Sequence, residues 1–154
     1  MNTFTLKYRA SVDGFNPGPF HQKCDGVTRL LTLIQTHTGY VFGGFATAAY
    51  TSNDAPIADP LNTAFLYTLI NPHGIAPTML LYKGSGGALH GSPYHGPIYS
   101  CNDLYIGSNS NSDINSDTGS RLGAAYIDTT GKGNELFAGQ LKLGLISEVL
   151  AFQV

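Results

Sequence analysis

Apolar and polar residues alternate over short stretches of this chain, a pattern typical of β-strands. Phe4, Leu6 and Tyr8 alternate with polar neighbours and predict a half-buried strand. Residues 63–70 are almost continuously apolar, which predicts a strand that is central or buried on both faces. The other strands are predicted at residues 30–36, 40–45, 78–82, 103–106, 121–127, 135–143 and 145–154.

The second and third of these strands are predicted to form a hairpin. Residues 30–36 and 40–45 are separated by three residues, the last of which is Gly39. A three-residue loop with glycine at the left-handed position favours a hairpin connection. Gly43 and Gly44 lie inside the second strand and indicate a bulge or a close approach of another part of the backbone.

One short helix is predicted between the first two strands. Asn16 can cap it, Pro17 suits its first position, and Gly26 can end it. Phe20 and Cys24 are four residues apart and therefore share one face, which we expect to be buried.

Eight to ten strands with one or two short helices predict an all-β chain that folds as a two-sheet antiparallel β-sandwich. The length of 154 residues fits a single domain, 1–154. The 19 glycines and eight prolines supply the turns that such a fold needs.

The charge distribution restricts the class of partner. The net charge is −2, and the eight lysines and arginines are scattered singly. Because no basic stripe is present to neutralise phosphates, we expect no nucleic-acid partner. The amino-terminal residues contain no apolar run of signal-peptide length, and no stretch is long enough for a membrane span. We therefore expect no membrane insertion and a cytoplasmic location.

His21 and Cys24 form an H-x-x-C pair that could begin a metal site or join a thiolate to its base. A zinc site would also need Cys101 and a further histidine, drawn from His37, His73, His90 and His95. A buried, unpaired Cys24 is the favoured interpretation, because the helix carboxyl end raises a thiol pKa. No metal, cofactor or catalytic residue is predicted, and the chain is not expected to be an enzyme.

Residues 107–120 form a polar stretch rich in Asn, Ser and Asp. Oxygen-bearing side chains occur at every second position from Asn109 to Asp117, as in a calcium loop. The glycine comes one residue late, however, and Ala124 stands where a calcium loop carries glutamate. A mobile surface loop is the default prediction, with calcium binding left open.

Several segments, taken in order, resemble the TLDc domain family. They are RASVDGF at 9–15, FHQKCDG at 20–26, LTLIQTHTGYVFGGF at 31–45, NTAFLYTLIN at 62–71, DLYI at 103–106, and the carboxyl-terminal FQV at 152–154. The chain differs from the family pattern at Tyr50, where many members carry tryptophan. In the last strand it keeps Glu148 but has Leu150 in place of a second glutamate.

This resemblance implies a two-sheet β-sandwich with few helices. Family members are linked to oxidation resistance and, in several eukaryotes, to binding and regulating the vacuolar proton-pumping ATPase. The first hypothesis is therefore a non-catalytic protein-interaction domain with a protein partner such as vacuolar ATPase subunits. The alternatives are a lectin-like or small-ligand-binding sandwich, and a thiol-dependent antioxidant enzyme that would use Cys24.

Overall fold

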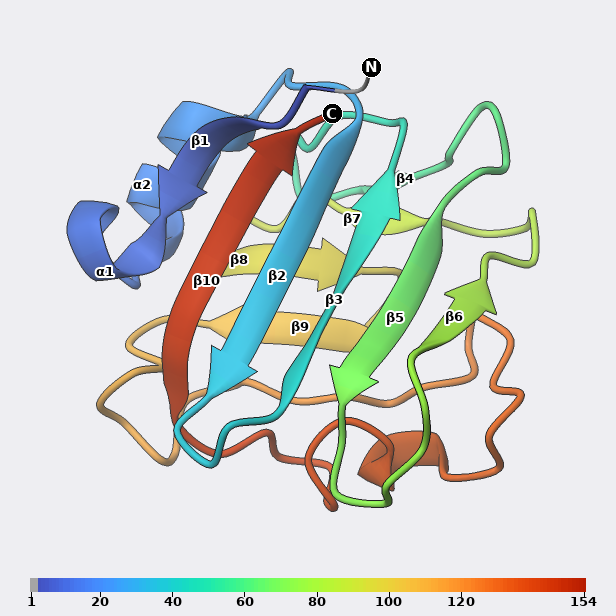
Figure 1. The fold of residues 1–154 in the computed structure, drawn as a ribbon. Coiled ribbons are helices and arrows are strands. Elements are labelled where there is room, and N and C mark those ends of the chain that lie inside the picture. Colours follow the sequence, from blue (N-terminus) through green and yellow to red (C-terminus); the bar gives the residue numbers. More distant parts are fainter. Residues whose placement is uncertain (1–2) are drawn as a thin grey trace.

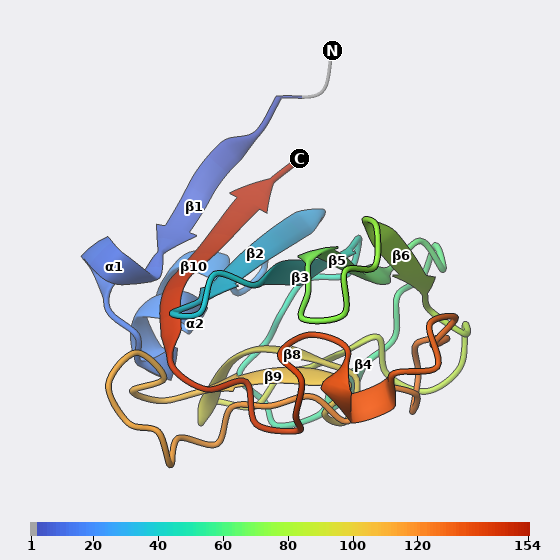
Figure 2. The same ribbon diagram turned by 60° about the horizontal axis from the view of Figure 1, so that its bottom comes forward.

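The computed structural model describes residues 3–154 and contains two antiparallel sheets stacked face to face (Figures 1 and 2). The larger sheet has the strand order β1-β10-β2-β3-β5-β6 and the smaller one has the order β4-β7-β8-β9. The strands are β1 (Thr5–Arg9), β2 (Leu30–Thr36), β3 (Val41–Ala46), β4 (Pro56–Ile57), β5 (Phe65–Ile70), β6 (Thr78–Leu81), β7 (Leu89–His90), β8 (His95–Tyr99), β9 (Leu104–Gly107) and β10 (Ile146–Gln153). The predicted all-β sandwich is confirmed.

The helices are short and lie at one end of the larger sheet, beside β1 and β10 (Figure 1). They are α1 (Ala10–Asp13) and α2 (Pro17–Cys24), and a single 3-10 turn follows at Gly133–Glu135. None of the helices described within residues 3–154 has the length and apolar character needed to cross a membrane.

The last strand, β10, lies inside the larger sheet and not at its edge. β10 pairs with β1 on one side and with β2 on the other, so that both ends of the chain lie in neighbouring strands (Figure 1). Thr5 is the register partner of Gln153, and Leu30 is the partner of the same residue from the other side. β1 is therefore joined to the rest of the sheet only through β10.

The predicted hairpin of β2 and β3 is confirmed, and Gly39 in its turn has a φ of +93°. The two glycines of β3 mark a close approach and not a bulge. A Cβ atom on Gly44 would lie 2.5 Å from the ring of Tyr99, which reaches across from the smaller sheet. Tyr99 also forms a 2.9 Å hydrogen bond with the hydroxyl of Thr32, so this contact joins the two sheets.

Helix α2 begins at Pro17 as predicted, but Asn16 does not cap it through its side chain. Instead, the side-chain oxygen of Asn16 accepts a 2.8 Å hydrogen bond from the hydroxyl of Ser108. Phe20 and Cys24 are fully buried, which confirms their predicted shared face. The helix consequently contributes to the core through one face, and Asn16, the residue before it, contacts the polar 107–120 segment.

The strands predicted at 121–127 and 135–143 are wrong. Both segments are irregular, with isolated bridges such as Tyr82 to Tyr126, and they close the sandwich without joining either sheet. Six of their apolar residues are nevertheless buried: Leu122, Ala125, Tyr126, Leu136, Phe137 and Leu143. Glycines at positive φ, including Gly123 and Gly139, prevent an extended backbone here.

Two buried carboxylates fix irregular backbone. Asp59 accepts hydrogen bonds from the backbone N–H groups of Thr47 and Ala48 after β3, and of Thr63 and Ala64 before β5. In the same way, Asp103 accepts from three N–H groups of the 123–126 segment. These bonds replace those that a sheet would otherwise supply to the backbone.

Candidate functional site

The outer face of the larger sheet is apolar where a sandwich normally presents polar residues to water. One row of register partners crosses all six strands. This first row consists of Leu6, Phe152, Leu31, Phe45, Phe65 and Leu81, in strand order from β1 to β6. Leu6 and Leu81, at the two edges, are 49% and 56% exposed.

A second row lies directly beside the first. It consists of Arg9, Leu150, Leu33, Gly43, Tyr67 and Met79. Beyond it the surface becomes mixed, with Glu148 and Gln35 on one side and Val41 and Leu69 on the other. We call the following set the apolar face: Phe4, Leu6, Leu31, Leu33, Val41, Phe45, Phe65, Tyr67, Leu69, Met79, Leu81, Leu150 and Phe152.

Two sequence predictions are corrected by this face. Residues 63–70 were predicted to be central or buried on both faces: β5 is central, between β3 and β6, but it is buried on one face only, with Leu66 and Thr68 in the core and Leu69 and Ile70 exposed. The predicted common face of the first strand is also divided. A register shift between Leu6 and Tyr8 turns Tyr8 into the core and leaves Leu6 outside.

Aromatic rings dominate one end of the apolar face. Phe45 and Phe65 stack with ring centroids 5.4 Å apart, and Phe4 meets Phe152 edge to face at 6.3 Å. The guanidinium of Arg29 lies 5.9 Å from the ring centroid of Phe45. Such aromatic pairs are favourable beyond the area that they bury, so the rings form a pre-ordered surface.

Tyr67 lies flat across the sheet because Gly43 leaves room for it. A Cβ atom at position 43 would lie 2.8 Å from the Tyr67 hydroxyl oxygen and would clash with the carbonyl oxygen of Thr32. The hydroxyl donates a 2.6 Å hydrogen bond to that carbonyl. Burial raises the pKa of Tyr67 well above its ordinary value, so the hydroxyl remains a donor at neutral pH. The ring of Tyr67 is thereby fixed as part of the surface.

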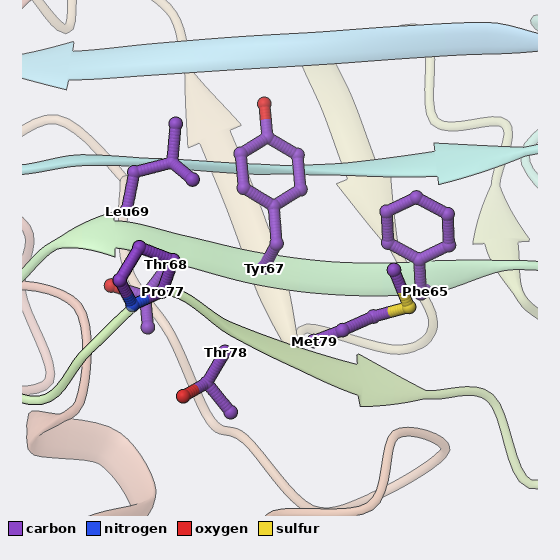
Figure 3. A pocket seen from close by; sticks show the side chains of 7 residues that line it. All are labelled: Phe65, Tyr67, Thr68, Leu69, Pro77, Thr78 and Met79. Carbon is purple, nitrogen blue, oxygen red and sulfur yellow. The ribbon is translucent and has the colours of Figure 1, made fainter.

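The same ring borders a shallow depression between β5 and β6 (Figure 3). Its walls are formed mainly by Phe65, Leu69, Pro77 and Met79. A second apolar depression lies beside the ring of Phe45. Both provide places where an apolar side chain of a partner could be inserted.

An ion pair lies at the border of the face, beside β1. Arg9 lies 3.2 Å from Glu148, and Glu148 also accepts hydrogen bonds from the backbone and the hydroxyl of Ser11. Partial burial would raise the pKa of Glu148, but the hydrogen bonds from Ser11 and Arg9 outweigh it and lower the pKa. This border therefore presents an ion pair and not a free carboxylate.

The H-x-x-C pair has two different surroundings, since His21 is hydrogen-bonded to other groups and Cys24 lies in the core. His21 Nδ1 lies 2.7 Å from an oxygen of Asp25, and its Nε2 lies 2.9 Å from the backbone oxygens of Ser92 and His95. Cys24 is fully buried, and burial raises the pKa of its thiol to about 12. The predicted buried and unpaired Cys24 is confirmed, since both cysteines are free.

Cys101, His90 and His95 line one polar depression on the smaller sheet. His90 lies 3.1 Å from Asp54, and His95 lies 3.0 Å from Asp117. His37 and His73 lie elsewhere, in the β2–β3 turn and after β5. Within residues 3–154, no group of three or more His, Cys, Asp and Glu side chains is arranged to hold a metal ion.

Sequence reasoning missed the apolar face, although the signal was present. Residues 63–70 carry apolar side chains on both faces of one strand, and such a pattern fits either two buried faces or one buried and one docking face.

A comparison of the whole chain with known protein families agrees with the resemblance that the separate segments show to the TLDc domain family. The family model of the TLDc domain matches residues 1–143. No match was found among the curated proteins searched.

Proposed function

Because the chain belongs to the TLDc domain family, we propose that it is a non-catalytic protein-interaction domain that acts in the cytoplasm and contributes to oxidative-stress resistance. In this proposal the apolar face is the docking surface. The family relationship suggests subunits of the vacuolar proton-pumping ATPase as the first partners to test.

The observation that supports this proposal is the pair of apolar rows across the larger sheet. Large exposed apolar patches on soluble domains mark interaction sites, and aromatic residues and methionine are enriched at the centres of interfaces. Phe45, Phe65 and Tyr67 supply fixed rings, while Met79 and Leu81 supply exposed side chains that can adapt to a partner.

Two further observations fit a binding role in a reducing compartment. Cys24 and Cys101 are both free thiols. The thiol-dependent alternative based on Cys24 is not favoured, because a buried thiol with a raised pKa supplies little thiolate.

A pull-down with matched variants tests the proposal. The baits are the wild-type chain, the double variant Met79→Lys/Leu81→Lys, and the control Ile114→Lys. Met79, Leu81 and Ile114 are 52%, 56% and 63% exposed, so each lysine can reach water without disturbing the core. Only the double variant alters the apolar face.

We expect vacuolar ATPase subunits to be retained by the wild type and by the control, and to be lost by the double variant. If the wild type retains none of these subunits, the ATPase is not the partner. If all three baits capture the same proteins, the apolar face is not the docking surface. Peroxide turnover by the pure chain would contradict the non-catalytic role.

A further inference from the structure

We infer that the apolar face binds a second copy of this chain, sheet against sheet, when no other partner covers it. The inference rests on the proposed function, because it names an occupant of the same docking surface. The available area, the shape and the charge of the face each support a second copy.

The exposed area approaches what one subunit contributes to a stable interface. Phe4, Leu6, Leu69, Met79 and Leu81 are between 42% and 61% exposed. With about 200 Å² for a large apolar side chain, these five offer about 500 Å², and the eight half-buried members of the face add to that area. A standard interface buries about 800 Å² on each partner, whereas the largest apolar patch of a typical monomer is only about 300–600 Å².

The shape of the face suits another sheet better than a helix. The face spans six strands, and the Tyr67 ring fills the space over Gly43, so the surface is broad and not a single groove. Figure 3 shows Tyr67 extending along the sheet from β5 towards β3 and β2. Sheets pack with their faces about 10 Å apart and their strands within about 30° of alignment. A second apolar face provides a surface of the same width and chemistry.

The charge of the face also permits self-association. In a two-fold dimer each residue near the axis meets its own copy, so an uncompensated charge there would be repelled. Apart from Arg9 at the β1 edge, the two rows contain only apolar residues and one glycine. Arg9 is paired with Glu148 in the same chain. The small net charge of −2 adds little repulsion between two copies.

Sedimentation equilibrium of the 154-residue chain tests this inference. At tens of micromolar we expect a mass of twice 16.4 kDa, which falls to 16.4 kDa on dilution. Met79→Lys/Leu81→Lys should give the monomer mass at the same concentration, and Ile114→Lys should remain dimeric. Far-UV circular dichroism of each variant verifies that the fold is retained.

A second variant keeps the test decisive if the double variant unfolds. Leu33→Glu places a carboxylate in the second row, between Leu150 and Gly43 in the register and without a basic register partner. It should also halve the mass, since a charge would then have to be buried between the two faces.

A wild-type chain that remains at 16.4 kDa, or a dimer that persists in both face variants, overturns the inference. The proposed function is judged separately. If the wild type is monomeric but protein capture is still lost in the double variant, the second copy is excluded and the docking face stands.

Discussion

Asp59 joins the end of β3 to the start of β5, and its replacement by asparagine should destabilise the fold. Its carboxylate accepts four backbone N–H groups at distances of 2.8–3.0 Å, from Thr47 and Ala48 on one oxygen and from Thr63 and Ala64 on the other. The side chain is only 2% exposed. Because Ala64 directly precedes Phe65, the same bonds also order the edge of the apolar face.

In Asp59→Asn, an amide NH₂ replaces one of the two accepting oxygens. Two backbone N–H groups then face a donor and lose their acceptor. Each buried group left without a partner costs about 1–3 kcal/mol, so the free energy of unfolding should fall by about 3–5 kcal/mol. For a chain of this size, that loss lowers the Tm by about 10 °C.

Urea unfolding followed by far-UV circular dichroism measures the effect. Asp54→Asn is the matched control, because the side chain of Asp54 is 60% exposed and its carboxylate is paired with His90 at the surface. The control should change the unfolding free energy by less than about 1 kcal/mol. A similarly small change in Asp59→Asn would refute the role assigned to the carboxylate.

The pH dependence follows from the same bonds. Burial raises the pKa of Asp59, but hydrogen bonds from Thr47, Ala48, Thr63 and Ala64 outweigh it, so the pKa lies below 3.8. The stabilisation is therefore complete above the unfolded pKa and is lost as the pH falls through the lower, folded pKa. The wild type should lose stability below about pH 4, and Asp59→Asn should lose less over that range.

Three further predictions concern the core, the thiols and the polar loop. Gly44→Val should prevent folding or cost several kcal/mol by circular dichroism, because its Cβ would lie 2.5 Å from the Tyr99 ring. A thiol reagent should label Cys101 rapidly and Cys24 only after unfolding, which mass spectrometry measures; fast native labelling of Cys24 would contradict its burial. In the polar loop predicted at 107–120, Ser110, Ser116, Thr118 and Ser120 are buried, so the fastest amide exchange is expected only at its exposed tip, 111–115; protection induced by calcium would reverse the default prediction of a mobile loop.

Local patterns predicted the elements whose backbone conformation depends on neighbouring residues. The β2–β3 hairpin follows from two apolar runs and Gly39, whose φ of +93° suits glycine. The burial of Cys24 follows from its spacing to Phe20 on one helical turn. In each case the determining residues lie within a few positions of one another.

The strand predictions at 121–127 and 135–143 failed because buried apolar side chains do not require an extended backbone. Tyr126 and Phe137 are completely buried, but they lie in irregular segments held by glycines at positive φ and by Asp103. The spacing of apolar residues indicates which side chains are buried. It does not indicate which groups form hydrogen bonds with the backbone N–H and C=O groups of those residues. The carboxylate that accepts these N–H groups belongs to Asp103, which lies 20 positions before Gly123 in the chain.

The two candidate sites depend on long-range pairing. The apolar face requires Leu6, Phe152 and Phe65 to lie in one row, although they come from opposite ends and the middle of the chain. The depression with His90 and Cys101 likewise forms only when β7 pairs with β8. The apolar run 63–70 signals one strand of the face, but the spacing of the residues indicates neither complete arrangement.

Oxidative footprinting of Met79 tests the central claim most directly. Met79 is 52% exposed on the apolar face, and Tyr94, on the other side of the sandwich near β8, is 74% exposed and serves as the internal control. Hydroxyl radicals should oxidise both in the isolated monomeric chain. In the complex with its partner, we expect Met79 to be protected and Tyr94 to remain reactive. Equal oxidation of Met79 in the free and bound chain would contradict the apolar face as the docking surface.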